Sequence, residues 1–565
     1  MNRYRKFLTW CQGYRILSIF AILALSAGQG WAASQQTGTI AAGVTSDWPT
    51  YNGSYAGDRY SQLDEVNSQN VSRLHQACTF DTGDKGGFQN GPVVVNGVIF
   101  LTTDIATYAI DGVTCEQKWK HIRDYSPHSW LGVNRGVAYL DGRIFRGAGD
   151  GHVYAIDALT GKTVWDVSIA DPKRGETVPA APIAWNGMVF IGNAGGDNFG
   201  VTGRVYALSA LDGHTIWQFD TVPETGPARA TWTKASLENP PTGGATWTSY
   251  TLDTQNGILY IPTGNVAPDF VAALHPGKSL YTTCVLALDA RIGRIAGYIQ
   301  PILNDQHDHD IAAPVALIMT KNGQQLALAA AKNGLLYGID RSAVRLEASV
   351  DAREKLAPES LIIRYQAATT TRENLDTMLS PDRSTRFCPG SQGGSEWNGP
   401  AYHPTLNLVF VPANDWCTSV RLANADTLRG QSGMPWSGSG DPQAAFGTMD
   451  PKEKWGGWLT AFDADSGVER WKYHSPTPLL AAVTPTAGGL IFTGDLNGDI
   501  LAFDAASGKI LWRDNVGNPM AAGVVTYLAL GHQRIAVAAG KLSPLWPVES
   551  GTARIIIFTL QSEEK

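Results

Sequence analysis

Short runs of alternating apolar and polar residues recur along the chain and predict β-strands throughout. In five copies, an alternating segment is followed by a turn rich in Asp, Ser and Gly and by a second segment. The second segment ends on a tryptophan 11 positions after the start of the copy, and the copies start at Tyr108, Tyr154, Tyr206, Thr460 and Leu501. Alternation bounded by turn formers is typical of paired strands. Each copy is therefore predicted to be a strand–turn–strand unit.

Two weaker copies begin at Leu286 and Tyr337 and lack the tryptophan. Repeats at these intervals are typical of four-stranded blades arranged radially. We therefore expect an all-β protein, an eight-bladed β-propeller in which the repeated tryptophans dock one blade against the next. The long interval between Tyr337 and Thr460 leaves room for an unmarked blade. Residues 345–387 are expected to form a polar excursion on one face.

Composition agrees with a large, turn-rich β protein. The chain has 565 residues with 61 Gly and 30 Pro, and only 17% of its residues are charged. These values exclude a coiled coil, a disordered chain and a helical bundle. The 44 basic and 51 acidic residues give a net charge of −7, which does not suggest a nucleic-acid partner.

Residues 1–33 predict a secretory signal peptide. Four basic residues precede the apolar run 16–27, and small residues follow at Ala32 and Ala33. A retained membrane anchor is the alternative, although the run is short for a bilayer span. Without residues 1–32 the chain keeps 40 basic and 51 acidic residues, a net charge of −11. We expect residues 34–565 to form one periplasmic propeller domain with no stable membrane insertion after cleavage.

Export also sets the expected state of the cysteines. Five follow the predicted signal: Cys78, Cys115, Cys284, Cys388 and Cys417. In an oxidising compartment they allow two disulfides with one thiol left over, and a bridge between Cys388 and Cys417 could staple a blade. No Cys-x-x-Cys-His motif occurs, so no covalently attached haem is encoded.

The segment Asn304–Asp310 is the first candidate for chemistry. It contains three acids and two histidines in seven residues. Residues two apart on an extended chain share a face, so Asp308 and Asp310 could both point at one cation. A carboxylate beside a cation can also act as a general base. An exposed acidic loop is the alternative interpretation.

Three further features concern the binding of a ligand. Trp247 follows two glycines, and a tryptophan face can stack on a flat ligand that glycines let approach closely. Asn265 carries an amide oxygen that suits a hard cation. Arg135 and Arg341 could bind carboxylate or phosphate groups by forked hydrogen bonds. Each of these residues could equally be structural: a core Trp, a turn Asn or a surface Arg.

With Trp48–Gly53, Arg59–Ser61 and Asn70–Val71, these motifs resemble the pyrroloquinoline quinone (PQQ) dependent alcohol dehydrogenases. The resemblance covers nearly all of the mature chain and implies an eight-bladed propeller that binds PQQ with Ca²⁺ or a lanthanide ion. It implies that PQQ is bound by Gln89, Arg135, Gly195, Gly196, Thr246, Trp247, Arg341 and Trp397. It implies that the metal is bound by Asp197, Asn265, Asp308 and Asp310.

The resemblance also assigns roles. Asp308 matches the catalytic base, which takes the alcohol proton as hydride passes to PQQ. Asp310 resembles the extra carboxylate of lanthanide-using members, although sugar-oxidising members can carry an acid there too. The family's metal-binding Glu falls on Asp197 or Asn198, and Asp197 is preferred.

Two other features depart from the family pattern, and they concern the substrate and the metal more than the cofactor. Ser129 and Trp130 replace an adjacent-cysteine pair, and Glu396 stands where relatives often have Asn. The spacing of Cys388 and Cys417 resembles a family disulfide.

The implied function is a periplasmic dehydrogenase that oxidises a primary or secondary alcohol or a polyol, with electrons passed to a soluble cytochrome c. The alternatives are a non-catalytic propeller scaffold, a quinoprotein that has lost its metal through the change at Asp197/Asn198, and a glycosidase that uses Asp308 and Asp310. Two carboxylates so close on one strand would flank a glycosidic bond poorly.

Overall fold

The computed structural model describes residues 47–129, 131–233 and 239–561, all within one compact unit, Val44–Lys565. The predicted signal peptide lies outside the described residues. In the described part of the chain, the strands form eight four-stranded antiparallel sheets and one three-stranded sheet. The all-β prediction is therefore confirmed.

Seven of the four-stranded sheets are made of strands in chain order. The first is β2 (Val93–Val95), β3 (Val98–Thr102), β4 (Ala106–Asp111) and β5 (Gln117–Ile122). The second is β6 (Ala138–Leu140), β7 (Arg143–Gly147), β8 (His152–Asp157) and β9 (Thr163–Ser168). The third is β10 (Ile183–Trp185), β11 (Met188–Gly192), β12 (Arg204–Ser209) and β13 (Thr215–Asp220). The fourth is β14 (Thr251–Asp253), β15 (Ile258–Pro262), β16 (Val285–Asp289) and β17 (Ile295–Ile299).

The remaining three of these sheets follow in the same way. The fifth is β18 (Ala316–Met319), β19 (Gln325–Ala330), β20 (Leu335–Asp340) and β21 (Ile362–Ala368). The sixth is β23 (Ala401–His403), β24 (Leu408–Asp415), β27 (Gly456–Asp463) and β28 (Glu469–Ser475). The seventh is β29 (Thr484–Pro485), β30 (Leu490–Gly494), β31 (Asp499–Asp504) and β32 (Ile510–Asn515).

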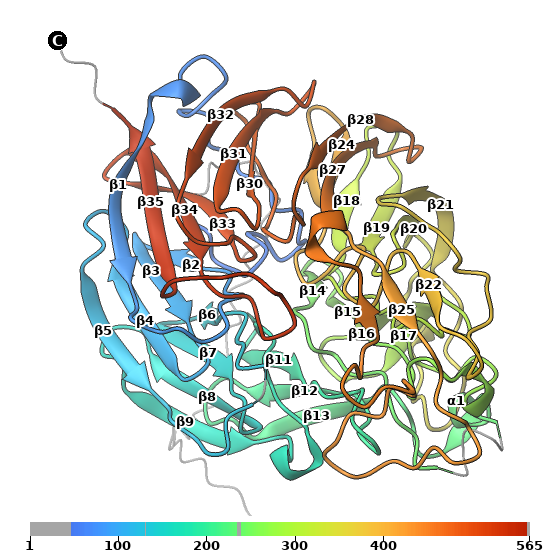
Figure 1. Ribbon diagram of the computed structural model, residues 1–565. Coiled ribbons are helices and arrows are strands. Elements are labelled where there is room, and N and C mark those ends of the chain that lie inside the picture. The colour runs from blue at the N-terminus through green and yellow to red at the C-terminus, as the bar shows by residue number, and fades with distance from the viewer. Residues whose placement is uncertain (1–46, 130, 234–238, 562–565) are drawn as a thin grey trace, which may run out of the picture. The chain divides into compact units, whose positions relative to one another are not determined.

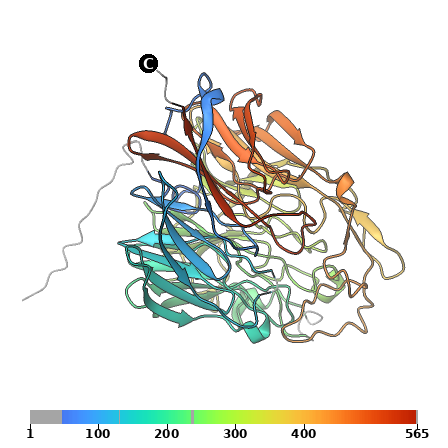
Figure 2. The same cartoon turned by 60° about the vertical axis from the view of Figure 1, so that its left-hand side comes forward.

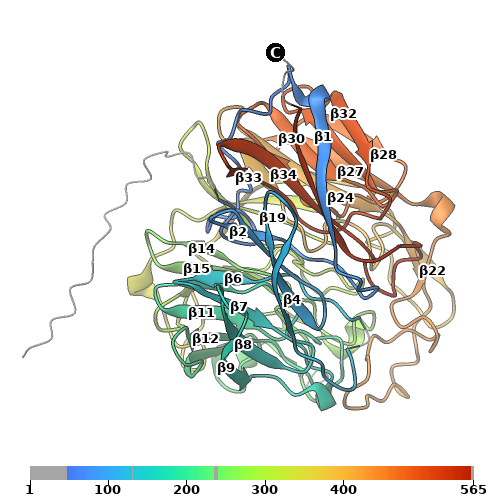
Figure 3. The same ribbon diagram turned by 90° about the vertical axis from the view of Figure 1, so that its left-hand side faces the viewer.

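The eighth sheet joins the two ends of the described chain. Strand β1 (Leu74–Asp81) pairs with β35 (Arg554–Leu560), which continues through β34 (His532–Ala539) to β33 (Val524–Ala529). Figures 1, 2 and 3 agree that the blue β1 runs beside the red C-terminal strands. The disulfide Cys78–Cys115 ties β1 to the turn after β4. This sheet was not marked by the repeat, because its strands come from distant parts of the sequence.

The repeated units form the third and fourth strands of their sheets. Four of the five repeat tryptophans donate from Nε1 to a carbonyl just after a strand of the next sheet, as Trp119 does to Ala158 at 2.9 Å and Trp165 to Ala210 at 3.1 Å. Trp119 also lies over Gly161, which has φ +72°, and a Cβ there would be 2.8 Å from the indole. A glycine is required at this turn both by its backbone conformation and by the close approach of the ring.

The structure corrects two expectations for the middle of the chain. The interval between Tyr337 and Thr460 contains no additional four-stranded sheet, but it holds the three-stranded sheet of β22 (Thr385–Phe387), β25 (Thr418–Val420) and β26 (Thr448–Met449). Residues 345–387 are not wholly an excursion, because β21 completes the fifth sheet. Its Tyr365 faces Gly338 as Trp119 faces Ala109 in the first sheet. A longer turn separates β20 from β21, and this insertion hid the strand.

Within residues 47–129, 131–233 and 239–561, helices are few and short. They are α1 (Gly226–Arg229) and the 3₁₀ turns Val71–Arg73, Pro172–Arg174, Ala272–Leu274, Leu346–Ala348 and Lys452–Lys454. In the described segments, no helix has the length and apolarity needed to cross a membrane.

The remaining cysteines behave as expected. Cys388 and Cys417 form the second disulfide, while Cys284 is buried and free. The prediction of two bridges with one thiol left over is confirmed.

Candidate active site

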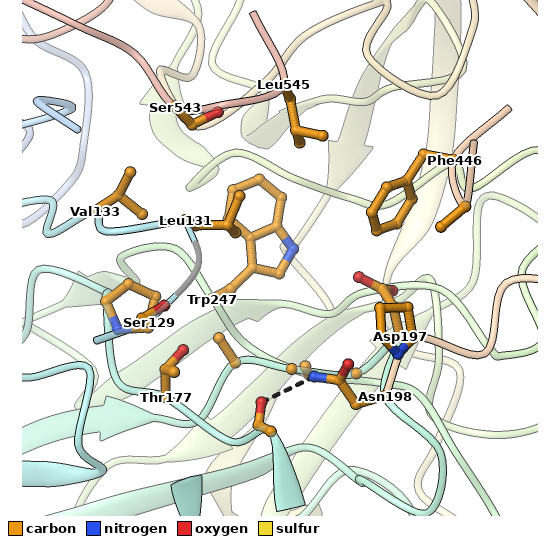
Figure 4. A pocket seen from close by; sticks show the side chains of 18 of the residues that line it. Ser129, Leu131, Val133, Thr177, Asp197, Asn198, Trp247, Phe446, Ser543 and Leu545 are labelled. Atoms are coloured by element: carbon orange, nitrogen blue, oxygen red, sulfur yellow. Dashed lines mark hydrogen bonds between the residues drawn. The ribbon is translucent and has the colours of Figure 1, made fainter. Parts of the chain in front are cut away.

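Loops between the sheets enclose a cavity of about 860 Å³. Trp247 lies in the middle of this cavity, with Leu131 and Val133 on one side and Phe446 on the other (Figure 4). The predicted cofactor-binding residues that line it are Gln89, Arg135, Gly195, Gly196, Trp247 and Trp397. The predicted metal-binding residues that line it are Asp197, Asn265, Asp308 and Asp310. The structure thus brings together residues spread over three hundred positions of sequence.

Two predicted residues, Arg341 and Thr246, lie outside the cavity lining, and the alternative metal ligand Asn198 lines it but is otherwise engaged. Arg341 does not line the cavity, because its guanidinium pairs with the Asp253 carboxylate at 3.0 Å. Thr246 is buried behind the wall, where its hydroxyl lies 2.7 Å from that of Tyr250. Asn198 reaches the cavity wall, but its amide donates to the Gly175 carbonyl at 2.9 Å (Figure 4).

The strongest feature is a cluster of three carboxylates, of which Asp269 and Asp308 are buried and Asp197 is half-buried. One oxygen from each of Asp197, Asp269 and Asp308 lies within 4.8 Å of the others. Asp269 is fully buried, and its Oδ1 accepts a hydrogen bond from Asn265 Nδ2 at 3.0 Å. Its Oδ2 has no hydrogen-bond partner among the described residues. Oxygen ligands with unsatisfied lone pairs are what a hard cation requires.

Sequence reasoning missed Asp269. It stands four residues after Asn265, in the same Gly264–Phe270 segment. The spacing was the available signal, since the loop that carries one oxygen ligand offered a second carboxylate nearby.

Lys332, which was also missed, provides a positive charge. Its Nζ lies 3.0 Å from Asp308 Oδ2 and 3.6 Å from Asp310 Oδ2, and all three side chains are buried. Burial opposes the charge of the lysine, but Asp308, Asp310 and Glu396 hold its pKa well above the usual value. Lys332 is therefore a fixed cation beside the predicted base.

One lysine does not balance this many carboxylates. Burial raises the pKa of Asp308 and of Asp269 well above the ordinary value, and the neighbouring carboxylates add to the effect. Burial and the charge of Asp310 raise the pKa of Asp197 to about 6. A bound cation would offset the repulsion and favour the ionised forms. The donor set therefore fits Ca²⁺ or a lanthanide ion.

Asp308 is presented by a strained turn. Its φ of 61° lies in the left-handed region, which non-glycine residues adopt at a cost. The Asp305 carboxylate stabilises this turn by accepting the backbone N–H groups of His307 at 3.3 Å and His309 at 2.9 Å. Asp305 thus positions the predicted base without contacting the cavity itself.

Asp310 connects the two halves of the site. Its Oδ1 accepts the backbone N–H of Asn265 at 2.7 Å, and its Oδ2 accepts the indole N–H of Trp247 at 3.2 Å. The predicted metal ligand Asp310 therefore already has protein donors on both oxygens. In this structure it orients the stacking Trp and the Asn265 loop.

Buried polar atoms without partners face the aromatic part of the cavity. The Arg135 guanidinium lies 4.7 Å from the Trp247 ring and 5.5 Å from the Trp397 ring. Burial lowers the pKa of Arg135 to about 10. Its Nε, Gln89 Oε1 and Glu396 Oε1 are buried and make no hydrogen bond within the described part of the chain. A flat ligand with carboxylate and polar groups would meet the rings, the unpaired Arg135 donor and the two unpaired acceptor oxygens, so these residues fit PQQ.

Glu396 is the unusual residue of this wall. Burial raises its pKa to about 7, while the charges of Lys332 and Arg135 lower it and that of Asp310 raises it. The carboxyl group therefore changes charge near neutral pH.

The segment 433–436, which lies between β25 and β26, closes one side of the cavity. The backbone N–H of Trp436 donates to the Asp197 carbonyl at 2.7 Å. The backbone N–H of Phe199 donates to the Met434 carbonyl at 3.1 Å. The segment therefore fastens directly onto the loop that carries Asp197. Of the two residues that replace the family's cysteine pair, Ser129 lines the cavity and Trp130 lies outside the described residues.

Comparisons with known proteins agree with this geometry. Residues 48–370 match the family described as glucose/ethanol/alcohol dehydrogenase, beta-propeller domain, and residues 456–555 match outer membrane protein assembly factor BamB. The chain is 29% identical to a quinohemoprotein alcohol dehydrogenase of Comamonas testosteroni, over 88% of this chain and 73% of that protein. It is 28% identical to a lanthanide-dependent methanol dehydrogenase of Methylacidiphilum fumariolicum, over 85% of this chain and 82% of that protein.

Solved structures give the same result. A europium-containing methanol dehydrogenase superposes with a TM-score of 0.78 at 25% identity, covering 91% of this chain and 98% of that one.

Proposed function

The chain belongs to the PQQ-dependent alcohol dehydrogenase family, and from this premise we propose that its cavity oxidises an alcohol with PQQ and Ca²⁺ or a lanthanide ion. The clustered carboxylates of half-buried Asp197 and buried Asp269 and Asp308, in the site that Trp247 lines, carry the proposal. A scaffold built on the same repeats would not need clustered carboxylates, whose burial is costly without a ligand. Relatives that are dehydrogenases over most of this chain oppose the scaffold alternative.

Each group of residues has a proposed binding role. Gln89, Arg135, Gly195, Gly196, Trp247 and Trp397 would hold PQQ, with Trp247 offering an aromatic face and Arg135 a positive charge beside it. Asp197, Asn265, Asp269 and Asp308 would hold the cation, and Asp310 would hold Trp247 and Asn265 in place. When bound, PQQ polarised by its cation supplies the acceptor for the two electrons of the alcohol.

A side chain of the protein would accept the proton of the alcohol. The Asp308 carboxylate would accept the hydroxyl proton of the alcohol, because a carboxylate beside a cation is ionised and lines the cavity. Lys332 at 3.0 Å would keep Asp308 ionised and fix its orientation. The Phe446 and Leu131 side chains would exclude water from the substrate side.

The cellular setting follows from the sequence. We propose that residues 1–33 are removed as a signal peptide, that the enzyme works in the periplasm, and that a soluble cytochrome c takes the electrons. We propose that the eight four-stranded sheets are the blades of one closed propeller docked by tryptophans. The substrate would be a primary or secondary alcohol or a polyol.

The test is reconstitution of the purified, chelator-treated protein with PQQ and either Ca²⁺ or La³⁺, followed by dye reduction with alcohols, polyols and aldoses. We expect turnover with PQQ and one of the ions. Asp308→Asn should still bind PQQ and lose turnover with every substrate. The control is Asp495→Asn, another buried aspartate, which lies after β30 and outside the cavity lining. It should keep wild-type kcat.

Two results would contradict the proposal. Failure to bind PQQ with either ion would reject the function, and an Asp308→Asn enzyme with intact kcat would remove Asp308 as the base.

A further inference from the structure

A second group of metal-binding side chains lies behind the catalytic turn. Asp305, His307 and His309 are on the same segment as Asp308 and Asp310, but in the described part of the chain they are not in the wall of the cavity. Their exposed fractions are 4%, 5% and 2%, and one ligand atom from each lies within 4.8 Å of the others. The segment therefore sends carboxylates into the cavity and a mixed nitrogen and oxygen set away from it.

The hydrogen bonds of His309 leave a lone pair facing a carboxylate. Its Nε2 lies 3.2 Å from the Pro389 carbonyl, which can only accept, so Nε2 carries the proton. In the neutral ring Nδ1 then has a lone pair, and this atom lies 3.8 Å from Asp305 Oδ1. Two acceptors face each other with no proton between them. A cation at this point would turn the repulsion into two bonds.

His307 supplies an independent observation. Its Nε2 is fully buried and has no hydrogen-bond partner among the described residues. Its ring stacks on that of His309 at 5.3 Å, and Phe387 packs against it at 4.5 Å. A buried imidazole without a partner costs free energy that a ligand would recover. The aromatic wall would also hold the ring in place for binding.

We propose that Asp305, His307 and His309 form a second metal site, for a borderline transition-metal cation such as Zn²⁺. Two neutral imidazoles and a carboxylate are a common three-ligand set for zinc, with a fourth position for water. The Pro389 carbonyl fixes the His309 tautomer, as an outer hydrogen-bond partner does in known zinc sites. The acid cluster of the cavity offers oxygen alone, so the two sites select different cations.

The fit requires a small contraction. Ligands about 2.0–2.1 Å from zinc are roughly 3.4 Å apart in a tetrahedron. The ligand atoms of this site lie up to 4.8 Å apart, so binding draws the side chains together by up to about 1.4 Å. Because Asp305 also accepts the N–H groups of the Asp308 turn, occupation of the site would stiffen that turn.

The test uses the full chain after chelator treatment, without PQQ or alcohol, so its outcome is independent of the proposed function. La³⁺ is added first to occupy the acid cluster. Cu²⁺, which is paramagnetic and binds such ligands strongly, is then titrated in and followed by electron paramagnetic resonance. We expect one Cu²⁺ per chain with splitting from two nitrogens. Zn²⁺, which binds nitrogen and oxygen ligands more weakly than Cu²⁺, should displace it when added in large excess.

Variants assign the nitrogens. His307→Phe and His309→Phe should each remove one nitrogen from the splitting and weaken Cu²⁺ binding at least about 10-fold. The control is His403→Phe, at a buried histidine on β23 whose ring centroid lies 5.0 Å from that of Tyr60, and it should bind as the wild type does. If a phenylalanine variant fails to fold, Asp305→Asn, which keeps one acceptor for the turn, should weaken binding about 10- to 100-fold.

The proposal is overturned by a spectrum without nitrogen splitting. It is equally overturned by splitting that persists unchanged in the His307→Phe or His309→Phe protein, or by unchanged affinity in Asp305→Asn.

Discussion

The Glu396→Gln variant tests whether ionisation of this buried glutamate lowers the free energy of unfolding. Glutamine keeps the shape of the side chain and removes its negative charge. Burial raises the pKa of Glu396 from 4.5 to about 7. Between these values the folded protein holds a proton that the unfolded chain has lost. The contribution of Glu396 to stability is therefore fully present below pH 4.5 and is lost as the pH rises through 7.

The magnitude follows from the size of this shift. At about 1.4 kcal/mol for each pKa unit, the ionised glutamate destabilises the folded protein by about 3 kcal/mol above pH 7. Unfolding entropy is about 2.1 cal/mol/K for each residue, so for the Val44–Lys565 unit this free energy corresponds to a Tm difference of roughly 3 °C. Glutamine does not ionise, so the variant avoids this penalty.

The assay is thermal unfolding of the wild type and the Glu396→Gln protein from pH 4.5 to 8.5, with chelator present and PQQ absent. We expect the two melting curves to lie together near pH 4.5 and the variant to melt about 3 °C higher at pH 8. Glu354→Gln, at an exposed glutamate, is the control and should change Tm equally at both pH values. A Glu396→Gln effect that is the same at every pH, or a variant that is less stable at pH 8 than at pH 4.5 relative to wild type, would refute the reasoning.

Three further outcomes follow from the same structure. Asp269→Asn should lower the affinity for Tb³⁺ or Ca²⁺ at least about 10-fold, because it removes one of three clustered carboxylates. Luminescence or calorimetry would measure this, and an unchanged affinity would exclude Asp269 as a ligand. Asp305→Ala should lower kcat roughly 10-fold while PQQ still binds, because the Asp308 turn loses its two hydrogen bonds. A loss of PQQ binding as large as the loss of kcat would indicate general unfolding instead. Cys388→Ser should destabilise the oxidised protein by about 3 kcal/mol but leave the reduced protein unaffected, as thermal melts with and without reductant would report.

Most of the fold could be predicted from the repeats, because each copy is a local sequence pattern. A strand–turn–strand unit with alternating residues is specified within a dozen positions, so β4–β5 and β8–β9 were visible in the sequence. Strand β21 was missed because the insertion after β20 separates it from its partner. The eighth sheet was missed for the same reason, since β1 pairs with β35 across almost the whole chain.

The site was predictable to the extent that its residues matched a family motif. Asp308, Trp247, Asn265 and Arg135 were expected to converge, and all line the cavity. Sequence could not separate Asp197 from Asn198, because that distinction depends on which side chain the Gly175 carbonyl engages.

Three-dimensional placement also determines which basic side chains lie at the site. Arg341 was expected there because it lies in a family motif, but its guanidinium pairs with the Asp253 carboxylate outside the cavity. Lys332 sits in a stretch with no motif and comes to within 3.0 Å of Asp308 through the pairing of β19 with β20. The β19–β20 hairpin is local, but the approach of its turn to Asp308, 24 residues earlier in the chain, has no signal in the local sequence.

The charges of the cavity explain why cation and cofactor should bind together. Asp197, Asp269 and Asp308 repel one another until a cation is present, whereas Arg135 and Lys332 attract anions. A cation alone would leave Arg135 Nε buried and unpaired, and a ligand with carboxylates alone would add negative charge beside the acid cluster. Each partner therefore lowers the electrostatic cost of the other, which amounts to positive coupling between two ligands. Asp310 adds a mechanical link, because it hydrogen-bonds both the stacking Trp247 and the Asn265 loop. The Asp310 carboxylate thus holds both the Trp247 ring and the loop of the predicted metal ligand Asn265 in place.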